Sequence, residues 1–342
     1  MPRINFSELD VFSVVDADTD EAKAFLTYLG YVRGIDALIC DAWGDLSFDA
    51  VVAAMDSSGR LRRMRGRRYV GPEGIVTSLL LNSWLTELHL HTPDTTDAGV
   101  IRIANHMASV YAYYATTRSA TAWLQVLNNA APTTHAALLK QMAKLISGST
   151  DLYPEPWGMR CTALYPTPVY AGFASPPGPC SNLARASNPY DIVGMCLRTT
   201  RGRQVKEAVN ERKRQLRRAK APRGEKQRCD QSVPPTTVFN FLWRARTRSN
   251  YGDPAMFYMG ALGDDDVLAY HRALRRITAG TCFVFEALIA QRAPELLINA
   301  ATHFITRDRS RLSDDVLLPR LSALGFTPPV RRRRGGPGLL SA

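Results

Sequence analysis

The sequence lacks the motifs on which the common enzyme classes depend. Its 342 residues contain no GxSxG, Walker A, GxGxxG or HExxH motif. These are the signatures of serine hydrolases, nucleotide sites, dinucleotide sites and zinc proteases. The chain also offers no isolated cysteine with a positioned histidine and no paired carboxylates in a cleft-like context. We therefore expect a protein that is not an enzyme and that needs no cofactor.

Cysteine, histidine and acidic residues are too scattered to predict a metal site. Six cysteines occur without a CxxC spacing, so we expect reduced thiols rather than a disulfide framework. His89 and His91 would share a face only in a strand, and no cysteine or acid completes a ligand set, so structural histidines are favoured. The successive acids Asp264, Asp265 and Asp266 suit the N-terminus of a helix better than a metal.

Long apolar runs are also missing. No hydrophobic core of the signal-peptide type follows Met1, and no stretch of about 18 apolar residues is present to span a bilayer. We expect an intracellular, soluble protein without stable membrane insertion. Its hydrophobic fraction of 45% is large enough for a buried core, which excludes a wholly disordered chain.

What the sequence does have is clustered positive charge. The net charge is +12, yet residues 60–68 alone hold six arginines and no acid, and residues 201–228 hold twelve Arg or Lys against three Glu. A third run, 331–334, is four arginines, so the rest of the chain is acidic, as in a protein with localised polyanion-binding surfaces. Arginine binds phosphate bidentately, which favours nucleic acid as the partner. The alternative is that each run is a solvated face or a nuclear-localisation-like patch.

Apolar residues follow helical spacing through most of the chain, and no run of alternating strands appears, so we predict a mainly α fold. Thr133 or Thr134 is expected to cap a helix that Gly148 ends. The predicted helices cover residues 20–31, 47–57, 71–88, 96–117, 133–148 and 203–220.

Changes in composition divide the chain. Residues 4–15 carry too many apolar side chains for a free tail, so this segment must dock on its own body or on a neighbour. The predicted parts are an N-terminal arm (1–18), a helical lobe (19–150), a Pro- and Gly-rich connector (151–200), a basic, partly flexible insertion (201–235), a second helical lobe (236–327) and a disordered basic tail (328–342).

Several segments, in the same order along the chain, resemble the nucleoproteins of phleboviruses and tenuiviruses. These proteins coat the RNA of segmented negative-strand viruses. The similar segments are TYLGY (27–31), GRLRRMRGRR (59–68), VIRIANHMA (100–108), YPTPVYAGF (165–173), ALRRIT (273–278), INAATHFIT (298–306) and LSALGF (321–326).

The resemblance implies two helical lobes with an RNA-binding cleft between them. It also implies that the arm, residues 1–18, reaches the adjacent protomer and links subunits into a homo-oligomer. Tyr28 and Tyr31 would meet bases by position, although spacing alone equally allows both rings to complete the apolar face of their helix. Arginines would meet phosphates at positions Arg60, Arg62, Arg63, Arg65, Arg67, Arg68, Arg102, Arg275 and Arg276.

The function that the resemblance implies is a viral nucleocapsid protein. It would bind single-stranded genomic RNA without sequence specificity, in the virion ribonucleoprotein and the host cytoplasm, with the viral polymerase as a further partner. The chain departs from the family by extra length near 181–250, where the basic helix has no counterpart. The alternatives are an amalgavirus-like coat protein and a basic accessory protein that binds an anionic membrane or an acidic host partner.

Overall fold

The structure is a computed structural model that describes most of the chain. The described residues are 19–43, 46–64, 69–164, 173–175, 183–222, 224–252, 254–307 and 312–327. The predicted arm (1–18) and tail (328–342), together with Arg65, Arg67 and Arg68, lie outside this part of the chain.

The prediction of a mainly α fold is confirmed. The helices are α1 (Asp20–Trp43), α2 (Phe48–Met55), α3 (Arg60–Arg63), α4 (Glu73–Leu88), α5 (Ala98–Asn128), α6 (His135–Gly148), α7 (Pro189–Gln215), α8 (Glu225–Ser232), α9 (Val238–Thr247), α10 (Ala255–Met259), α11 (Asp264–Arg292), α12 (Pro294–Arg307) and α13 (Leu312–Ala323). Two-residue strands β1 (Arg160–Cys161) and β3 (Thr236–Thr237) and the three-residue β2 (Phe173–Ser175) form a small antiparallel sheet in the order β2-β1-β3.

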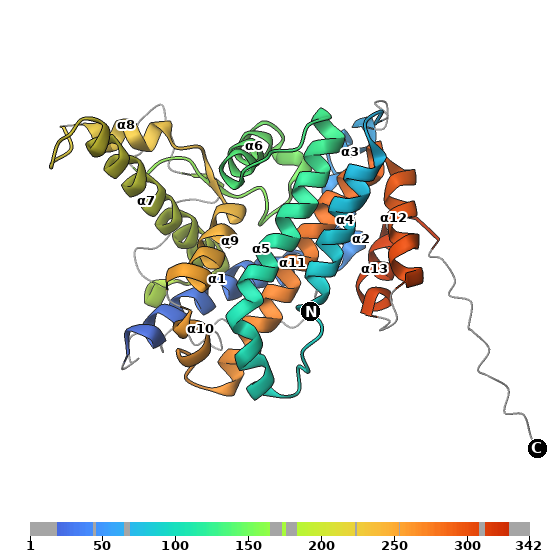
Figure 1. The fold of residues 1–342 in the computed structure, drawn as a ribbon, viewed down its shortest axis with the longest axis horizontal. Helices are drawn as coiled ribbons and strands as arrows, with labels where there is room; N and C mark the ends of the chain where they lie inside the picture. The colour runs from blue at the N-terminus through green and yellow to red at the C-terminus, as the bar shows by residue number, and fades with distance from the viewer. Residues whose placement is uncertain are drawn as a thin grey trace, which may run out of the picture.

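Helices α5 and α11 form the centre of the molecule, and they run side by side in Figure 1. Helix α5 is also packed against α4, and small residues dominate its buried positions, so the three helices approach closely. The hydroxyl of Ser83 on α4 donates to the carbonyl of Ala115 at 2.8 Å, and that of Ser119 donates to the carbonyl of Cys282 at 3.3 Å. These bonds satisfy polar groups that the close packing buries.

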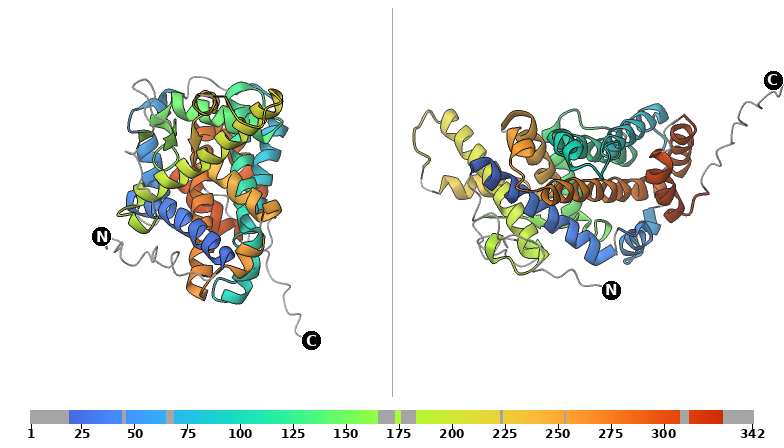
Figure 2. Two further views of the ribbon diagram at one scale, coloured as in Figure 1. Left: turned by 90° about the vertical axis from the view of Figure 1, so that its left-hand side faces the viewer. Right: turned by 90° about the horizontal axis from the view of Figure 1, so that it is seen from below.

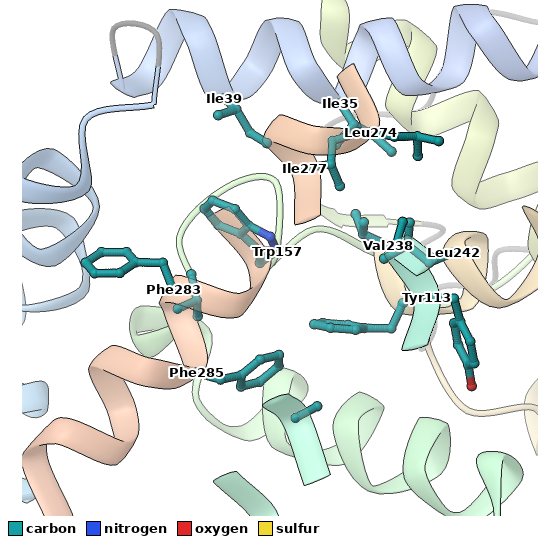
Figure 3. Packing of buried hydrophobic residues seen from close by; sticks show 14 of the residues in the cluster. Ile35, Ile39, Tyr113, Trp157, Val238, Leu242, Leu274, Ile277, Phe283 and Phe285 are labelled. Carbon is teal, nitrogen blue, oxygen red and sulfur yellow. The ribbon is translucent and has the colours of Figure 1, made fainter. Parts of the chain in front are cut away.

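Buried side chains from almost every helix converge on α11. Figure 3 shows Leu274, Ile277 and Phe283 of this helix among Ile35 and neighbouring apolar side chains. Trp157 is buried in this core, and its indole NH donates to the hydroxyl of Thr281 at 2.9 Å. A Cβ at Gly280 would stand 2.7 Å from the Trp157 ring, so glycine is what lets the indole lie against the helix.

Local capping explains where several helices begin. Thr134 accepts from the amide of Ala137 at 3.2 Å at the start of α6, as predicted, but the helix includes Gly148 and its C-cap is Ser149. Asn188 caps α7 and Pro189 occupies its first turn, which suits the fixed φ of proline. Helix α7 therefore begins inside the segment predicted as connector, and α8 lies inside the segment predicted as partly flexible.

One apolar core holds segments from both predicted lobes. It includes Val32 and Trp84 from residues 19–150 and Phe241 and Phe285 from residues 236–327. A smaller apolar cluster, with Val205 and its neighbours, joins α7 to α8. These two helices extend to one side of the body, away from α12 and α13, in Figure 1 and in the right-hand view of Figure 2.

Candidate functional site

Three of the arginines that the sequence nominated in the run 60–68 lie in the described part of the chain, and each contacts a nearby oxygen. Arg60 forms an ion pair with Asp151 at 2.9 Å and donates to the Ser149 hydroxyl at 3.1 Å. Arg62 pairs with Asp56, and its side chain is 76% exposed. Arg63 donates to the carbonyl of Ser58 at 3.2 Å. The interactions stabilise the α3 turn, but they leave Arg62 largely open to solvent.

Arg60 and Arg63 line a cavity of about 270 Å³ whose third cation is Arg292, at the end of α11. The cavity also contacts Trp123 and Leu127, near the end of α5. Arg102 lies 21 residues before Trp123 on the same helix, which is about 31 Å at 1.5 Å per residue. Arg102 therefore does not line the cavity with Arg60.

The other nominated arginines also connect parts of the fold. Arg102 binds Asp264 at 3.3 Å and joins α5 to the start of α11. Arg276 pairs with Asp36 of α1 at 3.2 Å, and Arg275 contacts Nδ1 of His91 at 2.8 Å. Arg275 and Arg276 lie 17 and 16 residues before Arg292 on α11, roughly 25 Å along the helix. The structure does not bring these arginines into the cavity around Arg60.

Tyr28 and Tyr31 are core residues, with exposed fractions of 4% and 2%. Their rings pack against Phe241 at centroid distances of 6.0 and 5.9 Å. Burial raises the pKa of Tyr31 to about 12, and the Thr199 hydroxyl lies 3.1 Å from its phenol oxygen. The packing agrees with the alternative in which the rings complete the apolar face of α1, and neither ring is open to a base.

Arg244 connects these tyrosines to a larger groove. Its guanidinium lies 5.3 Å from the Tyr28 ring centroid and 5.7 Å from that of Tyr31, and it donates to the Tyr28 hydroxyl at 3.1 Å. It also donates to the hydroxyls of Thr199 and Thr200 on α7, at 2.9 and 3.2 Å. A positive charge is thus fixed where α1, α7 and α9 meet.

This groove, which we call the α6–α7–α9 groove, has a volume of about 400 Å³. Four cationic side chains and a single acid, Glu207, line the groove. The cations come from three different helices or their ends. Gln204, Asn240 and Trp243 add amide and indole groups to the wall. The cations are Lys140, Arg203, Arg244 and Arg248.

Aromatic rings surround a second arginine beside the groove. The guanidinium of Arg246 lies 4.9 Å from the Trp243 ring centroid, 5.4 Å from that of Tyr114 and 5.2 Å from that of Tyr251. Tyr251 is 73% exposed, whereas Arg246 is buried. His135 packs on Trp243 at 4.9 Å, and burial, aided by Arg246 and Arg118, lowers its pKa. The site therefore combines aromatic surface with fixed positive charge and a neutral histidine.

A buried ion pair holds the wall of the groove in place. Arg201 pairs with Asp230 at 2.7 Å, with side chains 0% and 1% exposed. Its guanidinium also donates to the carbonyl of Pro234 at 2.9 Å, two residues before β3. The Thr236 hydroxyl donates to Gln204 at 2.6 Å, which ties β3 to α7. Helices α7, α8 and α9 are therefore joined by polar contacts that leave little freedom to the groove.

The sequence contains a signal for this site outside the three runs of clustered positive charge. Residues 239–251 (FNFLWRARTRSNY) interleave three arginines with four aromatic rings, a composition typical of surfaces that bind single strands. Lys140 and Arg203 had no such signal, because they meet these residues only after α6 and α7 pack beside α9.

Metal and membrane chemistry receive no support from the described ranges. Within them, no three His, Cys, Asp or Glu side chains gather as ligands for a metal ion. Of the helices described, none combines the length and the apolar character needed to cross a bilayer.

Comparison with known proteins returns no relative. No family model matches the sequence, no curated protein matches it, and no solved structure matches the fold.

Proposed function

We propose that this protein binds single-stranded RNA, without sequence preference, in the α6–α7–α9 groove. The observation that carries the proposal is the charge of the groove wall, where Lys140, Arg203, Arg244 and Arg248 face the single acid Glu207. Guanidinium and ammonium groups bind phosphate, and contacts to the backbone carry no sequence information. The groove therefore suits a phosphate backbone of any sequence.

Aromatic surface beside the cations favours a single strand over a duplex. Trp243 lines the groove, and the exposed ring of Tyr251 lies on the other side of Arg246. Bases that are free of pairing can stack on such rings, which contributes on the order of 1–3 kcal/mol per base. A duplex would keep its bases stacked on one another and would gain nothing from Trp243.

The biological role that we propose is a viral nucleocapsid protein that coats genomic RNA and oligomerises along it. In this proposal the cleft between the lobes is the α6–α7–α9 groove, since α6 belongs to residues 19–150 and α9 to residues 236–327. The arm, residues 1–18, would join neighbouring protomers. Deleting residues 1–18 should then convert oligomers to monomers in light scattering, with weak RNA binding retained; unchanged oligomers would exclude the arm as the linker.

RNA binding is tested by fluorescence anisotropy with labelled oligonucleotides of about 12 nucleotides, a length within the range of known single-strand sites. We expect similar affinities for oligo(U), oligo(A) and a mixed sequence, each falling steeply with salt. Each phosphate contact contributes about 0.7 to the log–log salt slope for a single strand. The double substitution Lys140→Ala/Arg203→Ala should therefore lower that slope by about 1.4.

The matched control is Lys23→Ala/Arg307→Ala, which removes the same charge from exposed positions on α1 and α12. It should leave the slope unchanged. Absence of RNA binding by the wild-type protein at low salt would refute the proposal. Equal loss in both double variants would mean that only the net charge matters and would exclude the groove as the site.

A further inference from the structure

Two cations of α7 form ion pairs in the contact of this helix with α8. On the side that contacts α8, Arg201 pairs with Asp230 and Arg212 pairs with Glu225 at 3.1 Å. Val205 and Val209 lie on the same side, buried against Cys229 of α8. The cations on this side therefore stabilise the contact between the two helices.

Six further cations, on α7 and in the turn after it, form what we call the α7 ridge. Lys206 and Asn210 follow Arg203 at helical spacing, beside the face of Val205 and Val209, and Lys213 comes one turn after Val209 at the edge of that face. Exposed cations continue in the turn after α7. The members of the ridge are Arg203, Lys206, Lys213, Arg217, Arg218 and Lys220.

None of the six ridge cations forms an ion pair within the described part of the chain. Like charges three or four residues apart on a helix destabilise it, by about 0.2–0.5 kcal/mol per pair. The helix dipole favours cations in the last turn, which accounts for Lys213 but not for Arg203 and Lys206, two or more turns earlier. Arg203 and Lys206 are such a pair of like charges, and neither has an ion-pair partner among the described residues.

The ridge continues directly from the groove. Arg203 belongs to both, since it lines the α6–α7–α9 groove. From Arg203 to the end of α7 at Gln215 the axis advances about 18 Å. Figure 1 shows this end of α7, with α8 beside it, extending away from the central helices, and the right-hand view of Figure 2 agrees.

From this continuity and charge we infer that the α7 ridge is a second binding surface for single-stranded RNA, along which the strand continues after it leaves the groove at Arg203. The inference rests on the proposed function. The six members of the ridge include no aromatic side chain, so its contacts would be to phosphate alone. The groove would hold a short strand by itself, and the ridge would add affinity only to a longer one.

The test compares oligo(U) of about 8 nucleotides, within the length of typical single-strand sites, with oligo(U) of about 30 nucleotides, well above it. The variant Lys206→Ala/Lys213→Ala/Arg217→Ala removes three ridge cations and leaves Arg203 in place. We expect its salt slope for the long strand to fall by about 2, at about 0.7 per contact, with binding of the short strand unchanged. The matched control, Lys23→Ala/Arg272→Ala/Arg307→Ala, should bind both strands like the wild type.

The outcomes separate the ridge from the groove. Wild-type-like binding of the long strand by the ridge variant would overturn the ridge inference and leave the groove proposal intact. Failure of the wild type to bind either strand would refute the groove proposal. Loss of poly-glutamate binding by the ridge variant, with long-strand RNA binding unchanged, would assign the ridge to an acidic protein instead. Equal thermal midpoints of the variants by circular dichroism would establish that all are folded.

Discussion

Helices α13 and α7 lie toward opposite sides of the molecule in Figure 1, and Arg320 on the first and Arg203 on the second occupy opposite environments. The Arg320 side chain is 1% exposed and binds two buried carboxylates, Glu87 at 3.0 Å and Glu286 at 3.1 Å. The Arg203 side chain is exposed, and no ion pair ties it to a described residue. A buried guanidinium must be paired because desolvation is costly, whereas an exposed one stays free for an external anion.

The largest effect is expected at Arg320. Arg320→Met leaves Glu87 and Glu286 buried without a counter-charge, and burial already raises the pKa of Glu286. Removing one partner of such a group costs about 3–5 kcal/mol of unfolding free energy, measured by urea denaturation. The exposed Arg307→Met on α12 should change it by less than about 0.5 kcal/mol. A loss below about 1 kcal/mol at Arg320 would show that the core tolerates the two carboxylates.

A smaller and more local effect is expected at Arg201. Arg201→Met removes the ion pair to Asp230 and the hydrogen bonds to the carbonyls of Cys161 and Pro234. Asp230 still accepts from the amide of Leu164 at 2.7 Å, and the apolar contact of α8 is the small cluster with Val205, so we expect α8 to open without unfolding the rest, at a cost of about 1.5–3 kcal/mol. Amide hydrogen exchange should rise in residues 225–237 and stay unchanged in α11. Faster exchange throughout the protein would mean that α7 and α8 are part of the global folding unit.

The pH dependence of stability tests the effect of buried charge near Arg320, through the titration of His91. Burial lowers the pKa of His91 from 6.5 to about 3, and Arg275, Arg320 and His271 act in the same direction. Below pH 6.5 the unfolded chain therefore binds a proton that the folded protein does not, so the unfolding free energy falls as the pH falls toward 3.

His91→Gln removes the contribution of this residue. Between pH 6.5 and 4 the slope of unfolding free energy against pH should decrease by at most about 1.4 kcal/mol per pH unit, the value for one proton. The measurement is a set of urea denaturation curves across that range. His303→Gln, at an exposed position on α12, is the control and should leave the slope unchanged. The same slope in His91→Gln and the wild type would contradict the lowered pKa of His91 in the folded protein.

The smallest effect is expected on the ridge. Lys206→Ala/Lys213→Ala relieves like-charge repulsion and removes no contact of the fold, so the unfolding free energy should rise or fall by no more than about 0.5 kcal/mol. Urea denaturation at low salt checks this, because salt screens the repulsion. A clear loss of stability would mean that these lysines stabilise the fold, as Arg320 does, and are not merely exposed cations.

Local signals in the sequence were sufficient for the shorter helices. The predicted range 71–88 nearly coincides with α4, and Thr134 caps α6 as predicted, because capping and a one-sided apolar face depend on neighbours in sequence. Helices α1 and α5 run about 11 or 12 residues beyond their predicted ends. Their later turns are buried on several sides, so the periodic contrast between faces that predicts a helix is lost.

The sequence by itself determined the mainly α fold, through the helical spacing of its apolar residues, and the concentration of positive charge in a few segments. Only the tertiary structure decided which cations are available to a partner. Arg201 and Arg203 are two residues apart on one helix, yet the first is buried against Asp230 and the second faces the groove. The carboxylate that pairs an arginine, and the helices that place Lys140 beside Arg248, come from distant positions in the chain. The pattern of charges along the sequence shows neither the pairing nor the helix packing, because both depend on distances in space.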